Sequence, residues 1–184
     1  MANIIPFKGY RYNTEKVGDM STVITPTKYN MGDEERTRYY ERNEYNAVRI
    51  FDGKEYDDDN ENSNKHTRAA DYLETWISND VLMRDGEETI YLYEETVTLY
   101  GNSFQNMTIV ALLELEELGE GDIKTCEEIR EMSKQDRYDL LSATNSDISM
   151  ISCLYKERDK RLFHLMNKLS RNKPDVEFDS DDLG

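Results

Sequence analysis

Residues 89–100, which read TIYLYEETVTLY, decide the fold class of this chain. They are rich in Thr, Val, Ile and Tyr, and a second apolar, partly β-branched run follows over residues 107–115. This composition is typical of β-strands. Because Gly101-Asn102-Ser103 lies between the two runs, we expect them to pair as an antiparallel hairpin.

Helices are expected before this hairpin. Residues 63–78 place Ala69, Leu73 and Trp76 on one face at a spacing of three to four residues, which is the pattern of an amphipathic helix. Residues 33–42 are polar, so they are expected to form only a short surface helix.

Two further helices are expected after the hairpin. The Ser133 hydroxyl is placed to cap the first of them, with Asp136 three residues on, near the positive end of the helix dipole. The second ends before Pro174, which forbids continuation. It carries an apolar face made of Leu162, Leu165, Met166 and Leu169.

Three other segments are predicted to be strands. Residues 4–12 suggest a short strand broken by Gly9, residues 46–51 a strand stopped by the turn pair Asp52-Gly53, and residues 148–155 a last strand. Together these elements predict an α+β fold with a mixed, largely antiparallel sheet and three main helices packed on it. We expect one domain over residues 1–174 and an acidic tail over residues 175–184.

Charge and composition exclude several classes of function. The chain has 184 residues and a net charge of −16, which argues against nucleic acid or an anionic membrane as partner. Two His and two Cys make no zinc site and no disulfide framework, and no metal site is predicted. There is no Gly-rich phosphate loop to identify a cofactor. Without a signal peptide or spanning segment, the cytoplasm is the expected location.

Two acidic stretches leave more than one interpretation. The carboxylates of Asp57–Glu61 are consecutive and lack the glycine of a calcium loop, so a solvated loop is expected. Glu114 and Glu116 share one face if their segment is a strand. Such a pair can bind Mg²⁺ or act in acid/base chemistry, and a solvent-facing sheet surface gives the same pattern.

Few single residues suggest chemistry on their own. Arg11 and Arg49 lie at or within predicted strands, where each can clamp an anion or pair with a surface carboxylate. His66 is expected at the surface, His164 in a partly buried packing role, and Cys153 in the core.

Residues 5–13, IPFKGYRYN, resemble the opening motif of the uncharacterised family called domain of unknown function 1015. Further segments that resemble the family follow in the same order, at residues 45–50, 69–76, 81–85, 90–95, 136–144 and 148–155. The resemblance also singles out the Asp136-Arg137 pair, and it implies that Arg137 joins Arg11 and Arg49 in holding an anion.

The chain also departs from the family pattern. Cys126-Glu127 stands where the family has a His-Glu pair, so Glu127 is the candidate catalytic residue that the resemblance leaves. Members are about twice this length, and their second half resembles ParB-type partitioning proteins and free-serine kinases through an Asp-Gly-His-His-Arg motif. This motif is absent here. We therefore expect the chain to correspond to the N-terminal half of such a protein.

Two functions follow from this resemblance. The first is a non-catalytic, stand-alone module that binds a protein partner, either a separately encoded C-terminal half or a second copy of itself. The second is one half of a nucleotide-dependent small-molecule kinase of the serine type, in which Arg11 or Arg49 holds an anion and Glu127 acts as base or magnesium ligand.

Overall fold

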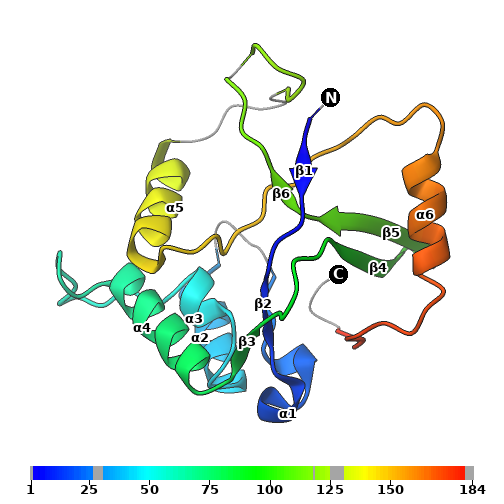
Figure 1. Cartoon of the computed structure of the whole chain (residues 1–184). Helices are drawn as coiled ribbons and strands as arrows, with labels where there is room; N and C mark the ends of the chain where they lie inside the picture. Colours follow the sequence, from blue (N-terminus) through cyan, green and yellow to red (C-terminus); the bar gives the residue numbers. More distant parts are fainter. Residues whose placement is uncertain (1, 27–30, 118, 125–130, 181–184) are drawn as a thin grey trace.

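The structure is a computed structural model, and it describes residues 2–26, 31–117, 119–124 and 131–180 (Figure 1). One 3₁₀ turn, Met20–Thr22, accompanies the helices and strands. In chain order these are β1 (Ile4–Ile5), β2 (Tyr10–Tyr12), α1 (Thr14–Val17), α2 (Asp33–Arg42), α3 (Val48–Phe51), α4 (Lys65–Ser78), β3 (Leu82–Arg84), β4 (Tyr91–Leu99), β5 (Asn102–Val110), β6 (Leu112–Leu113), α5 (Glu131–Thr144) and α6 (Arg161–Leu169).

The α+β class with antiparallel strands is confirmed. The strands form three two-stranded ladders, β1 with β6, β2 with β3 and β4 with β5. Residues 4–12 connect all three, because β1 and β2 belong to two of the ladders and Phe7 bridges to Thr89 just before β4. The N-terminal segment thus holds together parts of the chain that are far apart in sequence.

The hairpin that opened the sequence argument is confirmed, with its turn one position earlier than expected. Tyr100 and Gly101 form a two-residue turn with φ of 52° and 78°, and positive φ at both positions is what a type I′ hairpin turn requires. Pairing therefore begins at Leu99 and Asn102 and continues to Tyr91 and Val110.

The main core lies among helices α1, α3, α4 and α5, which we call the helical half. Trp76 on α4 is buried, and the rings of Tyr12, Tyr45 and Tyr72 lie 6.0–6.1 Å from it. Ala69 is also fully buried and Leu73 packs on the same cluster, so the predicted apolar face of α4 is confirmed. Asn64 caps this helix by accepting from the backbone of His66 and Thr67, as Asn does at helix starts.

The strand predicted over residues 46–51 is wrong. Residues 48–51 form the single helical turn α3, because the side chain of Asn46 accepts from the Val48 amide and starts the turn. The same buried side chain donates to the carbonyls of Thr22 and Ile24. These distant contacts override the strand-like composition of the segment.

The C-terminal third also differs from expectation. Residues 148–155 contain no strand, because none of the described residues pairs with them, and Cys153 is exposed rather than buried in the core. Ser133 lies inside α5 instead of capping it. His164 is exposed, with its ring against Phe163 at 5.9 Å. The last helix is confirmed as α6, which buries Met166.

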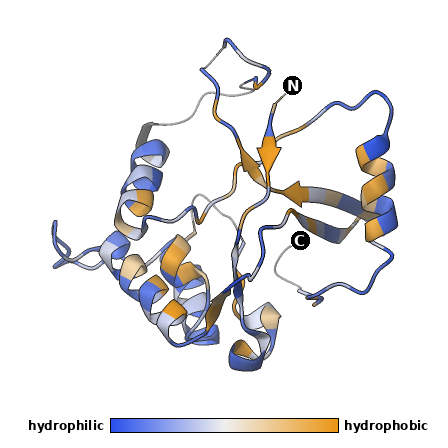
Figure 2. Cartoon of the chain, viewed as in Figure 1, coloured by the Kyte–Doolittle hydropathy of each residue, from blue (hydrophilic) through white to orange (hydrophobic). Residues whose placement is uncertain are grey.

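Strands β4, β5 and β6 together with α6, which we call the hairpin half, have almost no core of their own. Among the described residues, none of the buried hydrophobic side chains lies on β4, β5 or β6, and only Met166 lies beyond Leu140. Figure 2 shows hydrophobic colour on β1, at the end of β5 and in bands on α6. None of the helices among the described residues is long and apolar enough to cross a membrane.

Gly9 offers a test of the N-terminal contacts. A Cβ at this position would lie 2.7 Å from the Tyr91 hydroxyl oxygen and 3.1 Å from Cζ of the same ring. Gly9→Ala should therefore lower the free energy of unfolding by about 1–3 kcal/mol, measured by urea denaturation. Gly86→Ala is the matched control, because nothing lies within 4 Å of its Cβ position. Equal stability of the two variants would contradict the prediction.

Candidate functional site

Arg11 is the first of the predicted anion-binding residues. It lies on β2, and its guanidinium donates to both carboxylate oxygens of Asp85, with Nη2–Oδ1 at 2.7 Å and Nε–Oδ2 at 3.1 Å. Asp85 also accepts from the Tyr91 hydroxyl, which in turn accepts from the Gly9 amide at 2.8 Å. The hydrogen bonds from Arg11 hold the pKa of the Asp85 carboxyl below its usual value. Arg11 is thus engaged by a carboxylate of the chain itself.

Arg49 and Arg137 contact aromatic rings and backbone carbonyls. Arg49 on α3 lies 4.2 Å from the centroid of Tyr40 and donates to the Tyr40 carbonyl at 2.7 Å. Arg137 on α5 lies 4.4 Å from the ring of Phe51 and donates to its carbonyl at 3.2 Å. The contacts of Arg11, Arg49 and Arg137 share no residue, so they do not define one common anion site.

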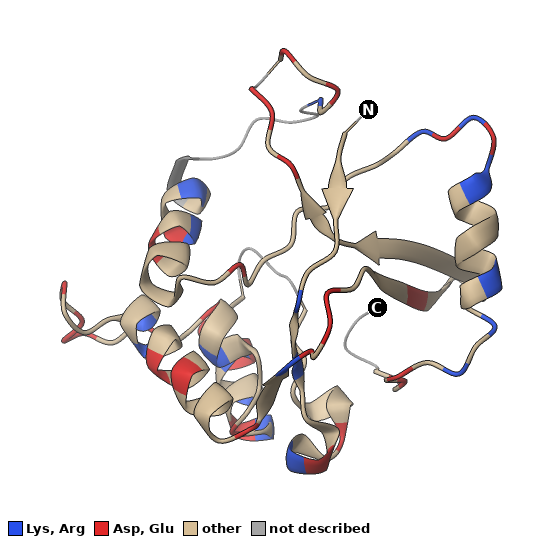
Figure 3. Ribbon diagram, in the orientation of Figure 1, with Lys and Arg blue, Asp and Glu red and all other residues tan. Residues whose placement is uncertain are grey.

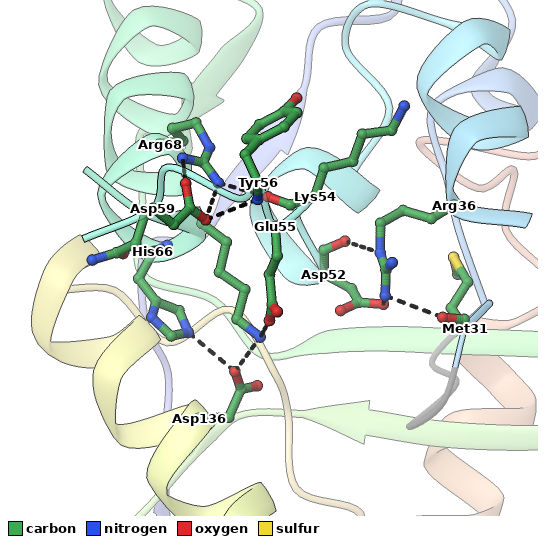
Figure 4. A network of polar contacts seen from close by, with 12 residues as sticks. Met31, Arg36, Asp52, Lys54, Glu55, Tyr56, Asp59, His66, Arg68 and Asp136 are labelled. Atoms are coloured by element: carbon green, nitrogen blue, oxygen red, sulfur yellow. Dashed lines mark hydrogen bonds and ion pairs between the residues drawn. The ribbon is translucent and has the colours of Figure 1, made fainter. Parts of the chain in front are cut away.

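The densest polar network surrounds the loop between α3 and α4 (Figure 4). Arg36 donates to the carbonyl and carboxylate of Asp52 at 3.0 and 3.1 Å. Arg68 binds the Asp59 carboxylate at 2.6 and 2.9 Å and the carbonyl of Lys54 at 2.6 Å. The acidic loop Asp57–Glu61 is therefore fixed through Asp59 to α4, which the sequence did not indicate.

Lys65, His66 and Asp136 form the titratable centre of this network. Asp136 Oδ1 lies 2.7 Å from Lys65 Nζ and 3.1 Å from His66 Nε2, and Lys65 also binds Glu55 at 2.8 Å. Burial alone would raise the pKa of Asp136, but hydrogen bonds from Lys65 and His66 outweigh it and leave that pKa lowered. Asp136 is thus an ionised acceptor that joins the start of α4 to α5.

The space beside this cluster limits its chemistry. The hollow that it lines, with Phe51 and Gly53, has a volume of about 10 Å³, which is room for about one water molecule. A small-molecule substrate needs a pocket of about 300 Å³ or more. A His–Asp pair can exchange protons with a water, yet the hollow has no room for a substrate. In this geometry the role of the cluster is structural, because it connects the start of α4 to α5.

The remaining acidic candidates from the sequence do not form a common site. Glu127 and Cys126 lie outside the described residues. Glu114 follows β6 and binds Asn3, while Glu116 accepts from the Ile123 amide, so the two carboxylates have separate partners. The part of the chain that the structure describes contains no group of three or more His, Cys, Asp or Glu side chains able to hold a metal ion.

Sequence reasoning missed the partners of the singled-out residues. Asp136 was considered for its place near a helix start and as part of the Asp136-Arg137 pair of the resemblance. His66 was assigned to the surface, although its side chain is only 18% exposed. No local pattern connects them, because 70 residues separate the pair. For Arg11 the sequence held a weak signal, because its partners Asp85 and Tyr91 both lie in segments that resemble the family.

Comparisons with known proteins identify a family. The model of the family described as "Protein of unknown function (DUF1015)" matches residues 4–184. No curated protein and no solved structure matches the chain.

Removal of the Asp136 charge should destabilise the fold in a pH-dependent way. Asp136→Asn weakens two charged hydrogen bonds, so we expect about 1–2 kcal/mol less stability at pH 7. The pKa of this carboxyl is lowered on folding, so its contribution is present above the unfolded value of about 4 and is lost as the pH falls through the folded value. The deficit should shrink between pH 5 and pH 3 in urea titrations.

Asp139→Asn is the control for this experiment, since Asp139 lies on the same helix and accepts only from Gln135 among the bonds described. Its effect should stay below about 0.5 kcal/mol. If the loss of unfolding free energy in Asp136→Asn did not change with pH, the stabilising role of the charged contacts of Asp136 would be contradicted.

Proposed function

The chain belongs to the DUF1015 family, and from this premise we propose that it is a protein-binding module rather than an enzyme acting alone. The proposal rests on one observation, the extent of surface that the chain leaves uncovered.

The exposed area is far larger than that of a compact monomer. The chain exposes 14674 Å² at a mass of 21.7 kDa. A compact monomer of this mass exposes roughly 9,000 Å², so about 5,000 Å² remains that such a monomer would bury. Obligate interfaces bury about 2,000–5,000 Å² counted over both partners, or about 1,000–2,500 Å² on each. The excess on this one chain is therefore more than enough surface for one permanent protein partner.

Several of the exposed apolar side chains lie close together in the sequence. Ile151 is 88% exposed, Leu154 is fully exposed, and Met150 and Tyr155 are also more than half exposed. All four lie in residues 148–155, which we call the 148–155 segment. Scattered exposed hydrophobics are normal, but a run of them on one segment marks an interaction site. We infer that a protein partner packs on this segment.

The cations do not favour a kinase half. A phosphate-binding arginine needs free donors aimed at a ligand. Arg11 donates to the carboxylate of Asp85, while Arg49 and Arg137 donate to the backbone carbonyls of Tyr40 and Phe51. Nε of Arg49 is buried and has no hydrogen-bond partner in the structure, but it lies apart from the other two arginines. The alternative of a nucleotide-dependent enzyme completed by a separate half therefore gains no support from the described arginines, and its base, Glu127, lies outside the described residues.

The 148–155 segment can be tested by charge substitution. Ile151→Asp and Leu154→Asp should each leave the free energy of unfolding within about 0.5 kcal/mol of the parent chain, because these side chains are exposed. Each should reduce recovery of the partner at least about tenfold, since a buried unpaired carboxylate is costly. The measurement is quantitative mass spectrometry of proteins retained from native cells by the tagged chain.

Leu115→Asp is the matched control. Leu115 is 90% exposed but lies outside the segment, so the same change there should leave recovery unchanged. Equal recovery with Ile151→Asp, Leu154→Asp and the parent chain would overturn the proposed binding surface.

A further inference from the structure

We propose that the outer edge of β5 is a self-association site, at which β5 of a second copy of the chain adds antiparallel to form a four-stranded sheet. This inference deepens the proposed binding function and rests on it. It identifies one partner, a second copy, and the strand through which that copy binds.

The hairpin is incomplete as a sheet. β4 and β5 pair only with each other over nine residues each. Among the described residues, no backbone hydrogen bond joins either strand to another segment along its outer edge. A two-stranded hairpin is marginal in water and gains stability from a third strand or a covered face. An unpaired edge of this length is a template for strand addition.

Charge decides which of the two edges is open to a second copy. β5 reads NSFQNMTIV and contains no charged residue and no proline, whereas β4 contains Glu94 and Glu95. Figure 3 shows β5 in tan throughout and acidic colour on β4. Natural edges that avoid pairing carry charges, prolines or bulges, and β5 has none of the first two.

The net charge makes this difference selective. Each chain carries −16, so two copies repel each other wherever acidic surfaces meet. Pairing through β4 would bring Glu94 and Glu95 toward the same residues of the partner, and like charges on adjacent strands are destabilising. The side chains of β5 itself are neutral, and two of them bind the β4 carboxylates: Gln105 donates to Glu94 at 2.7 Å and Asn106 to Glu95 at 2.9 Å. A second copy therefore fits β5 and is rejected by β4.

The register identifies the backbone groups that would receive the partner. Leu99 and Asn102 flank the two-residue turn, and the residue pairs of an antiparallel ladder alternate between bonded and non-bonded positions. By this rule the amides of every second residue point to the outer edge, and on β5 these are Ser103, Gln105, Met107 and Ile109. Ser103 and Gln105 are exposed, so this part of the edge is accessible.

The apolar face of the hairpin gains from the same arrangement. Val97 and Leu99 on β4 lie on one face with Phe104, the partner of Val97. Leu99 and Phe104 are each about half exposed. A symmetric pair of β5 strands places the two Phe104 side chains on one continuous face, because a two-fold interface uses the same residues on both copies. Side-chain contact then adds to the backbone bonds.

Gln105 and Thr96 provide a matched test, because they are cross-strand partners at the same height of the hairpin. Proline at either position removes an amide that points outward and no bond of the hairpin itself, so both variants strain the hairpin alike. Gln105→Pro should raise the dissociation constant of the dimer at least about tenfold, and Thr96→Pro should leave it unchanged. Light scattering after size exclusion, from about 1 to 200 μM, measures this constant, and circular dichroism verifies the fold.

A second pair of variants keeps the test decisive if proline unfolds the hairpin. Gln105→Lys puts a charge on the β5 edge next to Glu94, to which Gln105 now donates at 2.7 Å, so the hairpin itself retains that contact. Thr96→Lys puts the same charge on the β4 edge. The first should weaken the dimer and the second should not.

The outcomes separate this inference from the proposed function. A parent chain that is monomeric at 200 μM, or a dimer that Gln105 and Thr96 variants affect equally, overturns the β5 edge. The 148–155 segment is tested independently by partner recovery, which does not require a dimer. Loss of the dimer in the Gln105 variants alone establishes the site.

Discussion

The pairing of residues 4–12 is the constraint on which the rest of the structure depends. This short segment contacts β6, Thr89 and β3, which follow it by roughly 70 to 110 residues. Two side-chain contacts add to this pairing: the carboxylate of Asp85 binds Arg11, and the Tyr91 hydroxyl accepts from the Gly9 amide. Tyr12 extends the same segment into the core, where its ring meets Trp76 and burial raises the pKa of its hydroxyl. This one segment thereby couples the hairpin to the helices.

The two halves that this strand joins differ in how they are stabilised. The helical half buries Trp76 and its neighbours and fixes its loops with charged hydrogen bonds from Arg36, Lys65 and Arg68. The hairpin half has register and turn geometry but little burial. Local pairing without a core is a weak source of stability. The second half therefore has more to gain from a partner than the first.

Sequence reasoning succeeded where the signal was local and failed where it was distant. The apolar spacing along α4 and the β-branched runs around Gly101 are periodic patterns, and both elements were predicted correctly. Residues 46–51 have strand composition, yet Asn46 reaches carbonyls more than twenty residues away and starts a helical turn. Residues 148–155 also have strand composition, but a strand needs a partner to pair with, and none of the described strands pairs with them.

The same distinction applies to the candidate site. Strand position and the family resemblance singled out Arg11, Arg49 and Arg137, but they could not show that each guanidinium donates a hydrogen bond within the chain. Arg11 donates to a carboxylate of the chain, and Arg49 and Arg137 donate to backbone carbonyls. Both proposed binding regions, β5 and the 148–155 segment, contain no charged residue. The approach of another acidic protein therefore meets less repulsion there.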